Sequence, residues 1–225
     1  MSRYTLQLIE NHPVIEHDGL TILIDTGAPV TIARQTILPF MGHDHATQTA
    51  YGGADIPTLR QLTHIENLDV LMGMNILSRY KIVFDYPGLQ VDFDEPGSPF
   101  DGTAMPLHPG MAHPIVELEV LGANRRFFLD TGARLSYLDA ALCNGLEPSA
   151  READFHPSVG RFETPVYVLP VGVGGRTFDV RFGNLPAPIQ GLLGMGNASG
   201  IIGSDLFHRF KVCLDVQDGR WTVAD

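Results

Sequence analysis

The sequence lacks any long hydrophobic run. No stretch approaches the ~18 uninterrupted apolar residues of a transmembrane helix. The first residues, MSRYTLQLIENHPVIEHDG, also lack the apolar segment of a signal peptide. We therefore expect a soluble cytoplasmic protein that has no membrane partner and no pro-segment to remove.

Cysteines and basic residues are scarce as well. Cys143 and Cys213 are the only cysteines and show no CxxC spacing, so we expect reduced thiols and neither a metal nor another cofactor. Fifteen basic residues against 26 acidic ones give a formal net charge of −11. This charge argues against nucleic acid or an anionic membrane as a partner, because both would be repelled.

Short runs of β-branched and aromatic residues are abundant in this chain of 225 residues. Examples are TILI, KIVFDY, IVELEV, RFFL and KVCLDV, and the runs are separated by many of the 24 glycines and 16 prolines. The pattern predicts a mostly β protein with many tight turns. Helical signal is limited to MNILSRY, SDLFHRF and YLDAALCNG.

Three pairs of similar segments occur in the same order in the two halves of the chain. They are HPVIE and HPIVE, LIDTGAPVTI and FLDTGARLSY, and LMGMNILSRYKIVFD and IIGSDLFHRFKVCLD. Such a repeat predicts two homologous lobes related by a pseudo-two-fold axis. We place the first lobe at residues 1–97 and the second at 98–225, joined by a Pro- and Gly-rich connection at about 94–112.

An aspartate ends the apolar strand in each repeat, Asp25 after TILI and Asp130 after RFFL. A carboxylate in such a place is costly unless it is hydrogen-bonded, paired or needed, and the Thr-Gly that follows suits a tight turn. A pseudo-two-fold axis would bring the two carboxyl groups face to face, where like charges about 3 Å apart share one proton. One group could then activate a water molecule while the other donates to a carbonyl oxygen.

At these residues the sequence resembles the pepsin and retroviral-protease superfamily. It is most similar to the retropepsin-like branch, because both turns read Asp-Thr-Gly-Ala. The resemblance implies a bilobal, all-β acid-protease fold. It also implies an aspartic endopeptidase that cleaves polypeptides, needs no cofactor and, with both lobes fused, works as a monomer.

The resemblance also assigns roles to residues. Asp25 and Asp130 would be the catalytic pair, Thr26 and Thr131 would lock the two loops together, and Gly73 and Gly203 would pack beneath the aspartates. The loops would be completed by Gly27, Ala28, Thr31, Gly132, Ala133 and Ser136. Two departures concern the residue after Asp-Thr-Gly-Ala, where Pro29 and Arg134 replace the acid that is frequent in the family.

A β-hairpin, the flap, closes over the substrate in this family. Two segments are candidates, one around Tyr51, Gly52 and Gly53, and one around Gly160, Arg161 and Phe162. Tyr51 could equally be an ordinary strand aromatic. The span from Asp130 to Gly203 is longer than that from Asp25 to Gly73, so we expect unequal hairpins, with the second dominating closure.

Other motifs leave alternatives open. The segment His43-Asp44-His45 could bind a metal ion, but without a third ligand at fixed spacing we favour a polar turn. GLLGMGNASGIIG contains a Gly-x-Gly but lacks the strand-turn-helix context of a phosphate loop. Its LLG competes with IIG as the step behind Asp130, and we favour IIG because HRFKVCLD follows it.

Two other functions remain, a catalytically inactive peptide-binding protein and a structural β scaffold. The scaffold does not explain an acid at the end of a buried strand in both halves. For the enzyme, Ala28 and Ala133 bear on pH, because a Ser or Thr there could lower the pKa of the pair by hydrogen bonding and alanine cannot. We therefore expect an optimum at mildly acidic to near-neutral pH.

Overall fold

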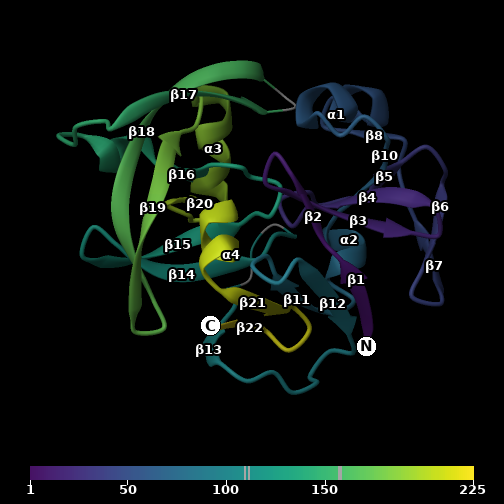
Figure 1. Cartoon of the computed structure of the whole chain (residues 1–225). Helices are drawn as coiled ribbons and strands as arrows, with labels where there is room; N and C mark the ends of the chain where they lie inside the picture. The colour runs from purple at the N-terminus through teal and green to yellow at the C-terminus, as the bar shows by residue number, and fades with distance from the viewer. Residues whose placement is uncertain (109, 111, 157–158) are drawn as a thin grey trace.

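Strands predominate in the structure, a computed structural model that describes residues 1–108, 110, 112–156 and 159–225 (Figure 1). They form three large sheets and two small hairpins, which confirms the mostly β prediction. Pro109 and Met111 of the predicted connection and Pro157 and Ser158 of the second hairpin segment lie outside the described residues.

A five-stranded sheet carries the first aspartate. In spatial order its strands are β2 (Gln7–Ile9), β3 (His12–His17), β4 (Leu20–Ile24), β10 (Leu68–Met72) and β5 (Ile32–Ala33). The other elements of this half are β6 (Ile37–Phe40), β7 (His43–Ala46), β8 (Ala50–Tyr51), β9 (Ala54–Asp55), α1 (Ile56–Thr63) and α2 (Met74–Leu77). Because β4 is buried and ends directly before Asp25, the sheet fixes where that carboxyl group lies.

A seven-stranded sheet carries the second aspartate. Its order is β14 (Ile115–Val120), β15 (Ala123–Leu129), β20 (Gly200–Ile202), β16 (Ser136–Leu138), β19 (Arg176–Asn184), β18 (Gly160–Val173) and β17 (Ala150–His156). A 3₁₀ turn (Ala140–Cys143), α3 (Ala187–Met195) and α4 (Ser204–Arg209) complete this half. β15 ends before Asp130 and pairs in parallel with β20, as β4 does with β10.

A six-stranded sheet joins the two halves beneath the aspartates. Its order is β1 (Ser2–Thr5), β12 (Gln90–Asp94), β11 (Lys81–Asp85), β21 (Lys211–Asp215), β22 (Arg220–Ala224) and β13 (Thr103–Pro106). The central pair, β11 and β21, is antiparallel and comes from opposite halves of the chain (Figure 1). β13 lies inside the predicted connection, so that segment contributes a strand to the sheet.

The largest hydrophobic cluster also spans both halves. It runs from Leu6 to Val223 and includes the fully buried Trp221. Phe84 of β11 meets Phe207 of α4 with ring centroids 5.3 Å apart. The two sheets that carry the aspartates therefore share one hydrophobic core.

Two helices and one strand differ from the sequence prediction. α1 and α3 were not predicted, and His43–His45 lies in β7, where we expected a polar turn. The strand is favoured because His45 is buried, with its Nε2 3.0 Å from the Tyr80 hydroxyl. Within the described ranges, no helix is long and apolar enough to cross a membrane.

Candidate active site

The two Asp-Thr-Gly-Ala loops meet at the ends of β4 and β15. The backbone N–H of Asp25 donates to the carbonyl oxygen of Met72 at 2.9 Å, and that of Asp130 donates to Ile202 at 3.0 Å. Each aspartate is thus fixed by the strand that runs parallel to its own. The loops leave the two sheets in the same way and face each other.

The two threonines exchange hydrogen bonds across the junction. The N–H of Thr26 donates to the hydroxyl of Thr131 at 3.0 Å, and the N–H of Thr131 donates to the hydroxyl of Thr26 at 2.9 Å. Each hydroxyl in turn donates to a carbonyl of the other half, Leu129 at 2.7 Å and Ile24 at 2.8 Å. Both side chains are fully buried, so water does not compete for these four bonds.

Each loop glycine lies against the carboxyl group of the opposite loop. A Cβ atom at Gly27 would stand 2.3 Å from the carboxyl atoms of Asp130, and one at Gly132 would stand 2.6 Å from Oδ1 of Asp25. The glycine N–H groups donate to the aspartate of their own loop, each at 2.8 Å. The two carboxyl groups therefore approach each other across two glycines that leave no room for a side chain.

A second glycine packs beneath each loop. The N–H of Gly73 donates to the hydroxyl of Thr31, and that of Gly203 to the hydroxyl of Ser136, both at 3.0 Å. A Cβ atom at Gly73 would meet Val30 and one at Gly203 would meet Ala133, both under 3.0 Å. Gly194, the competing glycine of LLG, lies in α3.

The pKa values of both aspartates are raised. Burial is the larger cause at Asp25, and the negative charge of Asp130 adds to it. Burial also raises the pKa of Asp130, while hydrogen bonds from Gly132 and Ala133 and the electrostatic effect of His113 act to lower it. Each residue keeps part of its surface exposed, but its carboxyl group is enclosed. The pair is therefore set to hold one proton between two groups.

Ala28 and Ala133 affect the aspartates through their backbone N–H groups. Ala133 donates to the Asp130 carboxyl through its backbone N–H, at 3.1 Å from N to Oδ1, and its side chain has no donor. A side-chain hydroxyl at either position would be a further donor. Its lack leaves burial as the dominant influence on the pKa of the pair.

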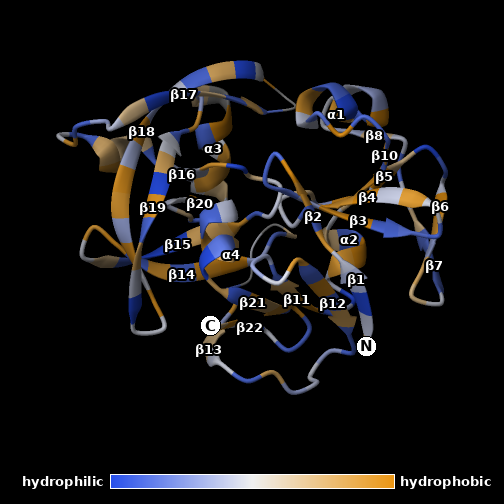
Figure 2. Cartoon of the chain, viewed as in Figure 1, coloured by the Kyte–Doolittle hydropathy of each residue, from blue (hydrophilic) through white to orange (hydrophobic). Residues whose placement is uncertain are grey.

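The two flap candidates are unequal in the structure. β8 and β9 pair through only Ala50–Asp55 and Tyr51–Ala54, with Gly52 and Gly53 in the turn. β17 and β18 pair along the whole of β17, down to His156 opposite Gly160. Figure 2 shows hydrophobic and hydrophilic residues alternating in bands along β18.

The candidate side chains differ in their surroundings. Tyr51 is 48% exposed, and Arg161 is also exposed. Phe162 packs against Tyr137 of β16, with ring centroids 6.3 Å apart. The long hairpin therefore rests on the strand that follows the second loop, and its closing role stays a prediction.

Two residues near the pair, Tyr86 and His113, were missed by the sequence analysis, and Arg134 was noted there only as a departure from the family pattern. The Tyr86 hydroxyl is buried without a hydrogen-bond partner in the described part of the chain, and burial and the charges of both aspartates raise its pKa well above the usual range. His113 lies close enough to act on Asp130, and Arg134 contacts both halves. Tyr86 stands where the repeat has Val216, a difference that could have pointed to it.

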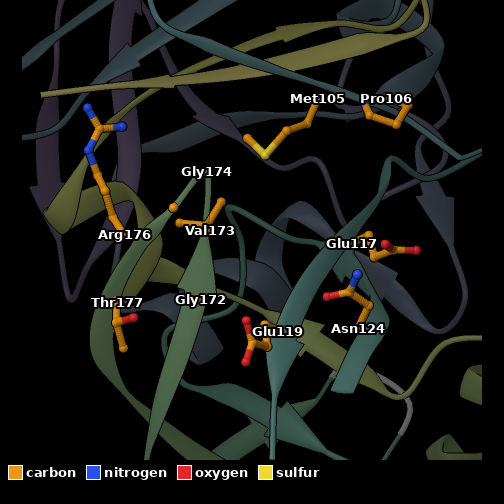
Figure 3. Close-up of a pocket in the computed structure, with 11 residues that line it drawn as sticks. Met105, Pro106, Glu117, Glu119, Asn124, Gly172, Val173, Gly174, Arg176 and Thr177 are labelled. Atoms are coloured by element: carbon orange, nitrogen blue, oxygen red, sulfur yellow. The ribbon is translucent and has the colours of Figure 1, made fainter. Parts of the chain in front are cut away.

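A separate pocket lies between β13, β14 and the turn from β18 to β19 (Figure 3). It has a volume of about 380 Å³ and is lined by Glu117, Glu119, Asn124 and Arg176, among others. None of the predicted site residues lines it. The described residues hold no group of three or more His, Cys, Asp or Glu side chains that could hold a metal ion.

Neither a family model nor a curated protein matches this chain. Among solved structures, the aspartic proteinase from Irpex lacteus aligns with 99% of this chain and 96% of its own, with a TM-score of 0.55 and 13% identity. A Simian Foamy Virus protease covers 40% of this chain and 88% of its own (TM-score 0.31, 18% identity). A retropepsin-like aspartic protease from Rickettsia conorii covers 56% and 95% (TM-score 0.37, 14% identity). Of these three matches, the first spans the whole chain.

Proposed function

We propose that this chain, which has the bilobal, all-β fold of an aspartic proteinase, is an aspartic endopeptidase. Asp25 and Asp130 would activate the water that hydrolyses the peptide bond. The observation that carries this proposal is the pair itself, in which each carboxyl group lies against the other loop's glycine. Both pKa values are raised there.

The chemistry follows from a single shared proton. The ionised carboxylate accepts a proton from water as the water attacks the carbonyl carbon, while the protonated partner donates to the carbonyl oxygen. The carboxyl group that took the proton from water then gives a proton to the amide nitrogen as the C–N bond breaks, while the other takes a proton back from the new hydroxyl group, so no covalent intermediate with the protein forms. The buried threonine bonds hold the two loops in register, and geometry of this kind is what effective general acid–base catalysis requires.

The proposal includes a setting for the reaction. An extended polypeptide would lie over the pair with the β17–β18 hairpin closing on it, and a single chain would be the active unit. Cys143 and Cys213 are free and buried, which fits the cytoplasmic location that we propose.

A peptide-library cleavage assay across pH tests the proposal. Wild-type protein is expected to cleave and to be inhibited by pepstatin, whereas Asp25→Asn and Asp130→Asn, assayed separately, should each lose activity. The proposal fails if either variant keeps full activity. A wild-type protein that binds peptides but cleaves none would instead be an inactive peptide-binding protein.

A further inference from the structure

Arg134 follows the second loop directly and contacts three groups at once. Its Nη2 donates to the carbonyl oxygen of Ala153 at 2.9 Å and lies 3.6 Å from Oδ1 of Asp154, both on β17. Its Nη1 lies 3.5 Å from Oε2 of Glu10, in the turn between β2 and β3. One side chain beside the catalytic loop thus meets the long hairpin and the opposite lobe.

The hairpin side of this contact is buried. The side chain of Asp154 is only 6% exposed, and a buried carboxylate requires partners. The Tyr137 hydroxyl donates to its other oxygen, and burial and the charge of Asp154 raise the pKa of Tyr137. Arg134 and Tyr137 come from the same segment, so the second loop and β16 hold one hairpin carboxylate between them.

The opposite lobe makes an independent contact with the same strand. His12, at the start of β3, is 2% exposed and packs against Phe155 of β17 with ring centroids 6.3 Å apart. Burial and the charge of Arg134 lower the pKa of His12 to about 4. The imidazole is therefore neutral near pH 7, and its contact with the hairpin is one of packing.

The first loop has no counterpart to this arrangement among the described residues. Pro29 stands where the second loop has Arg134, and its ring offers no charged donor. The nearby β8–β9 hairpin has only two residue pairs. Among the described residues, therefore, only the second catalytic loop is followed by a charged side chain that contacts a hairpin.

From these contacts we propose that Arg134 is a positioning residue, which sets the position of the β17–β18 hairpin relative to the catalytic pair and so governs substrate binding. This inference rests on the proposed function. Arg134 acts through the hairpin, because its guanidinium contacts Ala153, Asp154 and Glu10.

Hydrogen–deuterium exchange tests directly whether Arg134 holds the β17–β18 hairpin in place. Arg134→Met keeps most of the apolar stem and removes the guanidinium, so amides of residues 150–156 and 160–167 should exchange roughly tenfold faster. Amides of β11 and β21 should be unchanged. The control is Arg34→Met, because Arg34 is an exposed arginine of the first lobe. Equal exchange in Arg134→Met and wild type, or an equal effect of the control, would overturn the inference.

Kinetics separate positioning from a general loss of structure. On a peptide that wild type cleaves, Arg134→Met should raise KM severalfold and leave kcat and the pH profile near wild type. Arg134→Lys keeps the charge but cannot contact Asp154 and Glu10 in the same way. Its KM should therefore lie between those of wild type and Arg134→Met. A shifted pH profile, or a lower kcat with KM unchanged, contradicts the inference. If wild type cleaves nothing, the proposed function fails while the exchange result still decides whether Arg134 holds the hairpin.

Discussion

At the scale of single residues, the geometry of the two Asp-Thr-Gly-Ala loops depends on glycines at positions 27 and 132. Gly27 and Gly132 have no Cβ atom, and each faces the carboxyl group of the other loop. The aspartates were evident from the repeat. The close approach of each glycine to the opposite aspartate was not, because it depends on how two distant loops meet.

Gly27→Ala is expected to lose activity by about 100-fold, because the new methyl group would displace the Asp130 carboxyl, and a misplacement near 1 Å has an effect of that size. Peptide cleavage and urea denaturation measure the two consequences, with a destabilisation of about 1–3 kcal/mol. The matched control is Gly191→Ala in α3, where a Cβ atom meets nothing within 4 Å. Full activity in Gly27→Ala would show that the carboxyl groups do not need this geometry.

The raised pKa values predict the pH range of activity. The pair works while it holds one proton, and raising both values moves that window to higher pH. We expect the optimum of kcat/KM at mildly acidic to near-neutral pH. The measurement is a pH profile of cleavage, and a maximum below about pH 3, in the range of the pepsin pair, would contradict it.

The same pair should lower the stability of the fold at higher pH. An acid whose pKa is raised by folding favours the folded state at low pH, and that contribution is lost as the pH rises from the ordinary value of 3.8 through the raised one. A pKa that is higher by one in the folded state corresponds to about 1.4 kcal/mol of this contribution. Asp25→Asn should therefore gain stability over wild type at pH 8 relative to pH 4.

Urea midpoints at the two pH values measure this difference. Asp179→Asn, at an exposed position of β19, is the control and should show no such dependence. The interpretation is wrong if the difference between Asp25→Asn and wild type is the same at both pH values.

At the scale of elements, the two missed helices had different causes. α1 begins at a recognisable signal, since the Asp55 side chain accepts from the N–H of Thr58 at 2.8 Å and a proline lies in the first turn. α3 contains Gly191 and Gly194, which disfavour a helix. Its stability comes from packing, because Ile189 and Leu193 are buried in a cluster with Leu135 and Tyr137.

Leu193→Ala should consequently destabilise the protein by about 2–5 kcal/mol, because it leaves a cavity in the cluster that Leu193 forms with Leu135 and Tyr137. Leu192→Ala, on the same helix, should cost far less, since Leu192 is 43% exposed and Leu193 is 2% exposed. Thermal or urea denaturation of the two variants makes the comparison. Equal losses would mean that α3 does not depend on this packing.

At the scale of the whole molecule, the β-branched and aromatic runs predicted the mostly β character, and the repeat and the family resemblance predicted the bilobal fold that the whole-length structural match supports. The contacts between the halves could not be predicted in the same way. The Arg134–Glu10 pair joins residues 124 positions apart, and no periodicity marks such a pair. The lobe boundary near residue 97 stays a prediction, and β13 shows that the connection is part of the shared sheet.

A divided chain should test how much the halves need each other. Fragments 1–97 and 98–225, produced together, are expected to associate, because β11 of one pairs with β21 of the other. Activity should appear only in the mixture. Size-exclusion chromatography and peptide cleavage provide the readouts, and activity in either fragment alone would contradict a site shared between them.

The reciprocal hydrogen bonds between Thr26 and Thr131 affect how the molecule unfolds. Each threonine satisfies the backbone of the other at a fully buried position, so a state with only one lobe folded would lose these bonds and expose the hydrophobic cluster that both halves share. Partly folded forms are therefore disfavoured. The two lobes should melt in one cooperative transition, and a protein built from two similar units should behave thermodynamically as one.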